Sequence, residues 1–424
     1  MFKVVYVLNS DGQPLMPTER HGKVRRLLKS GKAKVIKRCP FTIKLLYDTG
    51  NIVQDVTLGV DAGSRHIGLS ATTDRKELIA SEVTLREDIT KLLSERRQCR
   101  RSRRNRKTRY RPARFENRTH SKHEGWLAPS VENKINTHLK AVDDVCRILP
   151  INRIIVETAS FDLQKLKADM EGLKYPQGTE YQQGEQSGFW NVREYVLFRD
   201  GHKCKCCKGK TKDKVLEVHH IESRMTGGDA PNNLITLCRT CHKGYHAGTV
   251  KLPSDIKRGT SFGDATFMGI MRWALYDRLK ATYPNVRMTY GYLTKEMRIE
   301  NGLDKTHCVD ARVISGNPAA EPSDSVYFQV ARRRHNRQIH KMTIGKDGYR
   351  KLNQTPKYVF GYQLFDKVLY NGTESFVYGR RTSGSFKVCD INGVCLKDGI
   401  SYKKLKLLEK RRTILTERRA RLLS

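Results

Sequence analysis

Several features that are common in other protein classes are missing from this chain. It has no apolar run long enough to span a membrane, and its first residues, MFKVVYVLNSDG, lack the layout of a signal peptide. Outside two Cys-x-x-Cys pairs, its eleven cysteines show no disulfide-like spacing. Acidic residues are few, with 44 Asp and Glu against 81 Lys and Arg. These absences exclude membrane-spanning and disulfide-framework proteins, and we expect a reducing, cytoplasmic location.

Positive charge is what the chain has in excess. Its formal net charge is +37 over 424 residues. A protein this basic needs a polyanionic partner, and nucleic acid is the usual one. The length is enough for two or three domains with cores of their own. We therefore expect a nucleic-acid-binding protein of several domains.

Residues 191–249 carry the densest set of chemically active side chains. Cys204 pairs with Cys207, and Cys238 pairs with Cys241. Each two-residue gap lets both thiolates bind one structural zinc ion. The 30 residues between the pairs are more than a zinc ribbon usually has, so a further element is expected inside the clamp. Within or just after this insert lie His219, His220, Asn232, Asn233, His242 and His246.

These residue types suit metal-dependent cleavage of a phosphodiester. A metal ion held by imidazoles polarises the phosphate, and a free imidazole can take the proton from the attacking water. His242 and His246 are four apart, so they share one face of a helix. The stretch resembles an HNH nuclease domain with a zinc clamp. The alternative is a purely structural zinc knuckle with surface histidines.

The resemblance to HNH nucleases implies a role for each polar side chain of the insert. His220 is the general base, and Asn233, or its neighbour Asn232, fixes the hairpin that carries it. The implied ligands of the catalytic ion are His219, His242 and His246.

A second set of candidates is widely spaced along the chain. Asp61 lies in the apolar segment TLGVDAGSRHIGLSATT, Glu157 ends the apolar run of INRIIVETASFD, and His307 and Asp310 lie three apart on an expected helix. A buried carboxylate is costly unless it is paired or bound to metal. Clustered by a fold, these side chains could hold two cations for phosphodiester cleavage. Each motif alone could equally be a hairpin Asp or a surface pair.

Residues 95–118 contain eleven arginines and one lysine against two glutamates. Such a density needs phosphates to neutralise it. A helix is feasible as far as Arg109, and Pro112 ends it. A disordered basic tail is the alternative, but the run lies between two core segments. We interpret it as a helix that contacts RNA through Arg96, Arg97, Arg100, Arg101, Arg103, Arg104, Arg106 and Arg109.

The remaining segments predict a mixture of strands and helices. Residues 1–55 predict a strand, a turn that contains PLMP (residues 14–17), a basic helix and two strands. An amphipathic helix is expected before Pro150, a linker over 162–190, a helix over 266–283, and a strand and turn over 285–305. The last hundred residues predict short strands with turns at Asn371-Gly372 and Asn392-Gly393, a small β-barrel, and a basic helix over 403–423.

This order of segments resembles IscB, a transposon-encoded family related to the type II CRISPR effector nucleases, over nearly the whole chain. The resemblance implies an α/β fold with small domains: a ribonuclease-H-like, RuvC-type core, split by an arginine-rich bridge helix and by an inserted zinc-stabilised HNH ββα-metal domain. A basic, β-barrel-like domain ends the chain. The implied boundaries are 1–55 for a PLMP-type domain, 56–90, 123–175 and 251–325 for the RuvC-like segments, 91–122 for the bridge helix, 190–250 for the HNH domain and 326–424 for the β-rich domain.

The implied function is RNA-guided cleavage of double-stranded DNA with a transposon-encoded omega RNA. The HNH site would cut the guide-paired strand, and the RuvC-like site, made of Asp61, Glu157, His307 and Asp310, the displaced strand. Mg²⁺ or Mn²⁺ would act at both sites beside a structural Zn²⁺. The protein would act as a monomer in a ribonucleoprotein, associated with the nucleoid when bound to DNA, and its tail would contact guide RNA and the target-adjacent motif.

Two departures and two alternatives accompany this hypothesis. Asp61 is followed by Ala-Gly rather than the commoner Pro-Gly, and the chain has no large helical recognition lobe, so RNA would supply that bulk. An unguided HNH endonuclease of the homing type would need neither the second acidic site nor the arginine run. A nuclease-dead RNA-binding scaffold would not need the acids and histidines.

Overall fold

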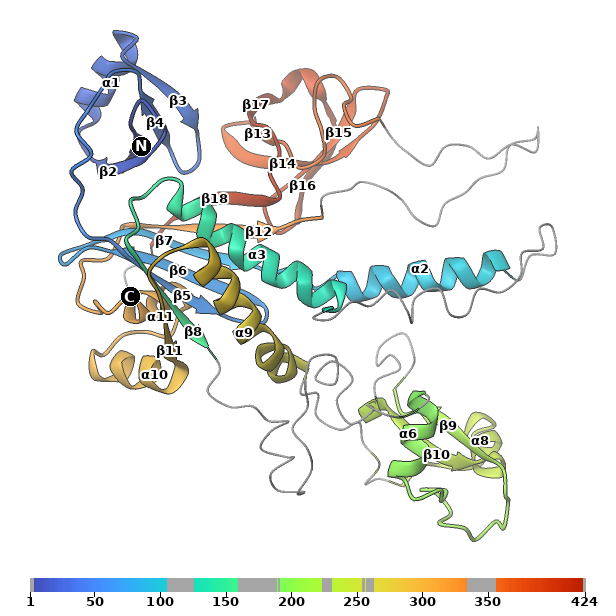
Figure 1. Cartoon of the computed structure of the whole chain (residues 1–424). Helices are drawn as coiled ribbons and strands as arrows, with labels where there is room; N and C mark the ends of the chain where they lie inside the picture. The colour runs from blue at the N-terminus through green and yellow to red at the C-terminus, as the bar shows by residue number, and fades with distance from the viewer. Residues whose placement is uncertain are drawn as a thin grey trace. The chain divides into compact units, whose positions relative to one another are not determined.

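The computed structural model describes residues 4–104, 126–158, 189, 191–222, 231–253, 256, 263–333 and 356–421, without the side chains of 102–104 and 263–267. The chain forms two compact units, shown in Figure 1. Unit 1 comprises residues 1–120, 128–160 and 271–424, and unit 2 comprises 121–127 and 161–270. None of the helices in these described parts is long and apolar enough to cross a bilayer.

A mixed seven-stranded sheet forms the centre of unit 1. Its strand order is β11-β8-β5-β6-β7-β12-β18. The hairpin-linked strands β5, β6 and β7 are antiparallel, β8 and β11 run parallel to β5, β12 runs parallel to β7, and β18 is antiparallel to β12. The bounds are β5 (Thr57–Ala62), β6 (His66–Thr72), β7 (Glu77–Thr84), β8 (Arg153–Thr158), β11 (Val286–Tyr290), β12 (Ser325–Ala331) and β18 (Ile414–Ala420).

Three longer helices belong wholly or partly to unit 1. α2 (Ile89–Arg104) confirms that the arginine-rich run begins as a helix, although Arg106, Arg109 and Pro112 lie outside the described residues. α3 (Pro129–Cys146) buries Ile135, Val142 and Val145, as its periodicity predicted. α9 (Gly263–Thr282) begins in unit 2 and ends in unit 1. The predicted linker over 162–190 lies almost entirely outside the described residues.

Two short helices follow β11. The prediction of a strand and turn over 285–305 is half wrong, because α10 (Gly291–Glu300) follows β11 directly. Its inward positions, Thr294, Met297 and Arg298, have helical spacing but are mostly polar, so they did not form an apolar stripe. α11 (His307–Ile314) begins at Thr306, whose hydroxyl accepts a hydrogen bond from the Val309 amide. This cap fixes the first turn, which carries the two functional candidates.

The N-terminal module is a four-stranded sheet, ordered β2-β1-β4-β3, with one helix. The bounds are β1 (Val5–Leu8), β2 (Pro14–Thr18), α1 (His21–Lys29), β3 (Ala33–Lys37) and β4 (Thr42–Leu45). The PLMP segment was predicted as part of a turn, and this is wrong, because it forms β2. β2 is an edge strand with an irregular register against β1, and such a strand tolerates prolines that lack an amide donor.

The C-terminal module is an antiparallel five-stranded sheet, ordered β16-β15-β14-β13-β17. The bounds are β13 (Lys367–Tyr370), β14 (Thr373–Arg380), β15 (Ser385–Cys389), β16 (Cys395–Ser401), a 3-10 turn η3 (Tyr402–Lys404) and β17 (Lys406–Glu409). Both predicted Asn-Gly turns connect strands, at 371–372 and 392–393. Whether the sheet closes into a barrel stays a prediction.

The prediction of a basic helix over 403–423 is wrong. The segment forms β17, which pairs with β13, and β18, which pairs with β12 over seven residues from Ile414 to Ala420. Lys, Arg, Leu and Glu favour helices in isolation. Here strand pairing with distant parts of the chain outweighs that preference, and Ile414 and Leu415 are buried by it.

Unit 2 contains a small ββα arrangement. Its described elements are α6 (Val192–Arg199), β9 (Leu216–His220), the 3-10 turn η2 (Pro231–Asn233), β10 (Leu234–Cys238) and α8 (Arg239–His246). β9 and β10 form an antiparallel ribbon, and α6 and α8 pack on it. The further element expected between the cysteine pairs is therefore this ribbon, of which β9 and most of β10 lie between Cys207 and Cys238.

Candidate active sites

Close contact between α11 and the β5–β6 hairpin positions the acidic candidates. A Cβ atom on Gly68 would lie 1.9 Å from the His307 carbonyl oxygen, and one on Gly59 would lie 1.9 Å from that of Ala311. Only glycine at these positions allows the helix to come so near the sheet. Because Asp61 is the cross-strand partner of Gly68, the helix places His307 beside it.

The predicted acidic residues come together in unit 1. Nδ1 of His307 and Oδ2 of Asp61 share a hydrogen bond of 2.6 Å, and the His307 ring stacks on His66. Glu157 lies on β8, which is paired in parallel with β5. Asp310 lies one helical turn after His307 on α11. We call Asp61, Glu157, His307 and Asp310 the acidic cluster.

The electrostatics of the acidic cluster favour a bound cation. Burial and the nearby carboxylates of Asp61 and Asp310 raise the pKa of Glu157 to about 7. Burial and Asp61 also raise the pKa of Asp310, and the hydrogen bond with Asp61 raises the pKa of His307. Like charges held together in this way resist ionisation until a positive charge joins them. The donors therefore fit hard divalent cations such as Mg²⁺ or Mn²⁺.

α10 supports the cluster with two residues that the sequence did not indicate. The Thr294 hydroxyl donates a hydrogen bond to the Tyr290 carbonyl at 3.5 Å, and its polar interaction with Glu157 lowers the pKa of that carboxyl. Arg298 Nε lies 3.1 Å from Oδ1 of Asp310, but this oxygen has no hydrogen-bond partner of good geometry among the described residues. A buried carboxylate oxygen without such a partner is suited to bind a cation. No pattern in the sequence relates α10 to Asp310, so these roles needed the structure.

In unit 2, three of the predicted histidines meet between β9 and α8. Ligand nitrogens of His219, His242 and His246 all lie within 4.8 Å of one another, and the Nε2 atoms of His242 and His246 are 3.2 Å apart. Burial, followed by the neighbouring histidines, lowers the pKa of His219 to about 4, which keeps it in the neutral form that binds metal. Its Nε2 is buried without a hydrogen-bond partner among the described residues. These three residues are the histidine trio.

Glu217 is a functional residue that the sequence interpretation missed. Its Oε2 lies 2.6 Å from Nδ1 of His242, the ring nitrogen opposite the one that faces His246. A carboxylate in this position fixes the tautomer and the orientation of a metal-binding imidazole. A detectable pattern was present, because Glu217 and His219 are two apart on a strand and so share one face.

Asn233 and His220 are the predicted structural Asn and general base, and both roles stay predictions. Asn233 is fully buried, accepts a hydrogen bond from the Glu222 amide at 2.9 Å and donates one to the Glu222 carbonyl at 3.1 Å. It thus ties the residues after β9 to the start of β10, which favours Asn233 over Asn232 for this role. His220 is half-buried, is the last residue of β9 and directly follows His219.

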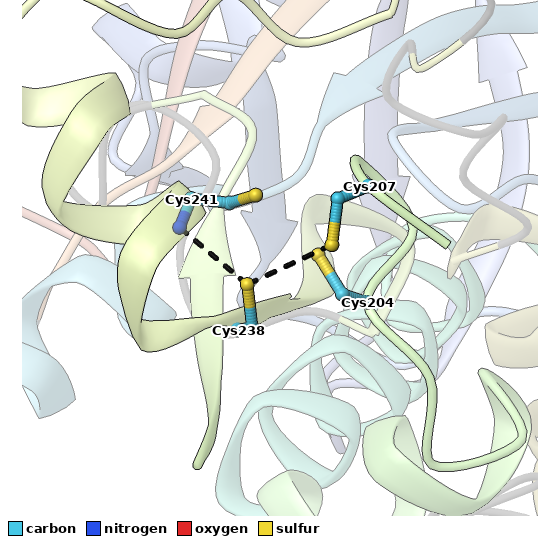
Figure 2. A group of neighbouring side chains, drawn as sticks. All are labelled: Cys204, Cys207, Cys238 and Cys241. Carbon is cyan, nitrogen blue, oxygen red and sulfur yellow. Dashed lines mark hydrogen bonds between the residues drawn. The ribbon is translucent and has the colours of Figure 1, made fainter. Parts of the chain in front are cut away.

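The four paired cysteines converge beside the ribbon, as Figure 2 shows. Their sulfurs lie within 4.8 Å of one another, and those of Cys207 and Cys238 are 3.8 Å apart. A tetrahedral zinc ion with Zn–S bonds of about 2.3 Å needs sulfurs about 3.8 Å apart. Although burial opposes it, hydrogen bonding with Thr211 lowers the pKa of Cys207 to about 6. Donor set and spacing therefore fit a structural zinc ion.

The arginine-rich helix α2 is described only in part. Arg96, Arg97, Arg100 and Arg101 lie on it, and the side chains of Arg103 and Arg104 lie outside the described set. Arg96 and Arg97 are exposed, as a phosphate-binding surface requires.

Models of two known families match parts of the chain. A model of RRXRR proteins matches residues 5–184, and a model of HNH endonucleases matches residues 204–248. The second match covers all four paired cysteines and the histidine trio. Residues 204–248 are therefore a metal-dependent HNH endonuclease domain, which confirms the enzyme prediction for this part of the chain. The two matches together confirm the resemblance to IscB-like, HNH-containing nucleases. No curated protein matches the chain.

Several Cas9 structures are similar to parts of the chain. Streptococcus thermophilus Cas9 in complex with a GGAA PAM is 14% identical over 50% of this chain and 29% of its own, with a TM-score of 0.31. The complex with an AGGA PAM is 13% identical over 45% and 26%, with a TM-score of 0.29. The type II-C Cas9 of Actinomyces naeslundii is 12% identical over 62% and 60%, with a TM-score of 0.20. The match thus spans about a quarter of the Streptococcus thermophilus chains.

Proposed function

We propose that this chain is an RNA-guided DNA endonuclease with two active sites. At the site that cuts the guide-paired strand, the histidine trio would hold a metal ion that polarises the phosphate, and His220 is the general base. At the site that cuts the displaced strand, the acidic cluster would hold the divalent ions that stabilise the developing negative charge. The observation that carries the proposal is the presence of two separate sets of metal ligands in one chain, one built of carboxylates and one of imidazoles.

The strand order supports a ribonuclease-H-like, RuvC-type core. A meander of β5, β6 and β7 is followed by β8 and β11, which extend the sheet on the other side of β5 in parallel. Asp61 lies on the first strand and Glu157 on the fourth, so both acids lie near the centre of the sheet. The predicted domain boundaries remain part of this proposal.

Charge supports an RNA partner. A net charge of +37 attracts a large polyanion. We propose that the partner is a transposon-encoded omega RNA, bound by the arginines of α2 and by the basic C-terminal module, with one chain in each ribonucleoprotein, which joins the nucleoid when it binds DNA. An unguided homing-type enzyme would have no use for the acidic cluster.

Metal preference should differ between the two sites. Carboxylates suit Mg²⁺ or Mn²⁺, whereas imidazoles suit transition ions. Of the two expected ions, Mn²⁺ is thus the better fit for the histidine trio. The zinc ion between the four cysteines is structural and takes no part in cleavage.

Exchange of the guide tests the proposal. The chain should co-purify with a long RNA of defined sequence when prepared without nuclease. Replacing the guide segment of that RNA should move the cut to the DNA that matches the new segment. A chain that cuts one fixed site without RNA would be an unguided endonuclease, and a chain that binds RNA but cuts no matching DNA would be a scaffold.

A further inference from the structure

Two exposed tyrosines lie next to the acidic cluster. Tyr290 is the last residue of β11 and Tyr292 belongs to the first turn of α10. They are 41% and 57% exposed, and their rings are nearly parallel, with 9° between the planes and 6.1 Å between the centroids. Burial of a large aromatic side chain is normally favourable, so exposed aromatic pairs often mark a binding surface.

The residue between the tyrosines touches the cluster. A Cβ atom on Gly291 would lie only 2.9 Å from Oε1 of Glu157. Thr289 is the cross-strand partner of Glu157, and Tyr290 is the partner of Thr158. The backbone that carries both rings therefore runs directly beside this carboxylate.

The elements that carry the tyrosines, and the segment that leads into α11, also carry exposed basic side chains. Arg287 on β11, Lys295 on α10 and Lys305 before α11 are all exposed. Lys305 is near enough to Asp310 to act on its carboxylate. Exposed aromatic rings beside cations are what proteins use to bind single-stranded nucleic acid, since the rings stack on bases and the cations contact phosphates.

We propose that Tyr290 and Tyr292 form a stacking platform for an unpaired base of the DNA strand that the acidic cluster cuts. A base in a duplex is already stacked on both faces, so the platform selects single-stranded DNA. Stacking tolerates any base, so the platform sets the position of the scissile phosphate without choosing a sequence. The tyrosines are positioning residues, and the inference rests on the proposed function of the acidic cluster.

Fluorescence of 2-aminopurine tests stacking directly. The full chain is titrated, without added Mg²⁺ or Mn²⁺ so that no cutting occurs, into a single-stranded 12-nucleotide DNA with 2-aminopurine near its middle. Stacking on tyrosine should quench the probe. Tyr290→Ala and Tyr292→Ala should each lose quenching and weaken binding about 5-fold or more. Tyr47→Ala, an exposed tyrosine of the N-terminal module at 37% exposure, is the matched control and should change neither.

Conservative variants separate stacking from general contact. Tyr292→Phe and Tyr292→Trp keep an aromatic face and should retain quenching and binding, whereas Tyr292→Leu keeps apolar area only and should lose quenching. The inference would be overturned if Tyr292→Leu quenched the probe as strongly as the wild-type chain does, or if both Ala variants behaved like wild type. Should an Ala variant fail to fold, as judged by thermal melting, the Phe and Leu pair still decides the question.

A cleavage assay separates this inference from the proposed function. With Mg²⁺ and the guide RNA, Asp61→Ala should abolish the cut in the displaced strand, and Tyr292→Ala should slow that cut alone. Loss of the cut in Asp61→Ala with no effect of either tyrosine refutes the platform but leaves the cluster's function standing. An undiminished cut in Asp61→Ala refutes the function on which the platform depends.

Discussion

The four side chains of the acidic cluster come from three segments spread over residues 61–310, whereas the histidine trio lies within residues 219–246. The cluster is assembled by a large sheet whose strands bury Leu58, Val60, Leu69 and Val156. The trio is assembled by a short ribbon and one helix. The apolar cluster that packs beside them is small, with five buried residues, three of which are paired cysteines: Cys204, Ile235, Leu237, Cys238 and Cys241. One site thus depends on a hydrophobic core, and the other on a metal clamp.

The two sites also differ in how they tolerate the absence of their catalytic ions. Carboxylates repel one another when they ionise, and the pKa of Glu157 rises to about 7 for this reason and through burial. In the trio, burial and then the neighbouring histidines lower the pKa of His219 to about 4, so this ligand stays neutral without a metal ion. The described residues hold two groups of three or more ligand atoms within 4.8 Å, the cysteines and the trio. The acidic cluster is not one of these two groups, so its ligand atoms are spread more widely.

The largest expected difference between the two sites is in their response to loss of zinc. Structural zinc contributes about 10–16 kcal/mol of apparent binding free energy in small domains. We expect Cys238→Ala to unfold the HNH domain while the seven-stranded sheet stays folded. Hydrogen exchange should show lost protection in β9 and β10 and unchanged protection in β5–β7. Cys206→Ala, which removes a neighbouring cysteine outside the clamp, is the control, and full zinc retention by Cys238→Ala would contradict the assignment.

A steric clash between α11 and the sheet should disrupt the acidic cluster and leave the histidine trio intact. Gly68→Ala places a methyl group against the His307 carbonyl, so α11 must move at a cost of about 1–3 kcal/mol. Cleavage by the acidic cluster should be lost while cleavage by the histidine trio is kept. Gly22→Ala in α1 meets nothing within 4 Å and serves as the control. Wild-type cleavage of both strands by Gly68→Ala would show that the close approach does not matter.

The smallest expected effect is a pH-dependent change in stability of the metal-free protein. The folded-state pKa of Glu157 is about 7, above the usual value of about 4.3, so ionisation disfavours the folded state. The cost is absent below about pH 4, grows as pH rises to 7, and is complete above it. Glu157→Gln should therefore raise the melting temperature at pH 8 but not at pH 4. An equal shift at both pH values would mean that charge is not the cause.

Residues whose chemistry defines a site could be predicted from the sequence. Cysteine pairs and adjacent histidines are recognisable because few other arrangements use them, whereas acids at strand ends become informative only as a set. Asp61, Glu157, His307 and Asp310 could be grouped although no local pattern joins them, since phosphodiester cleavage needs several carboxylates. The structure brings them together as that argument expected.

Features that arise from long-range packing could not be predicted. The PLMP segment carries two prolines, and only its position at a sheet edge makes it a strand. The tail favours a helix locally, but β12 and β13 each offer it a partner strand. Gly68, Thr294 and Arg298 look ordinary in the sequence, and their importance comes from α10 and α11 lying against the sheet.

Strand-labelled cleavage of a guide-matched DNA tests the central claim, which is that the two sites cut independently. Removal of a general base typically costs about 10²–10⁴-fold in rate, so His220→Ala should leave the guide-paired strand intact and cut only the displaced strand. Asp61→Ala should do the reverse, and the double variant should bind without cutting. If Asp61→Ala removed both cuts and His220→Ala removed neither, a single active site would do all the cutting and the HNH domain would be structural.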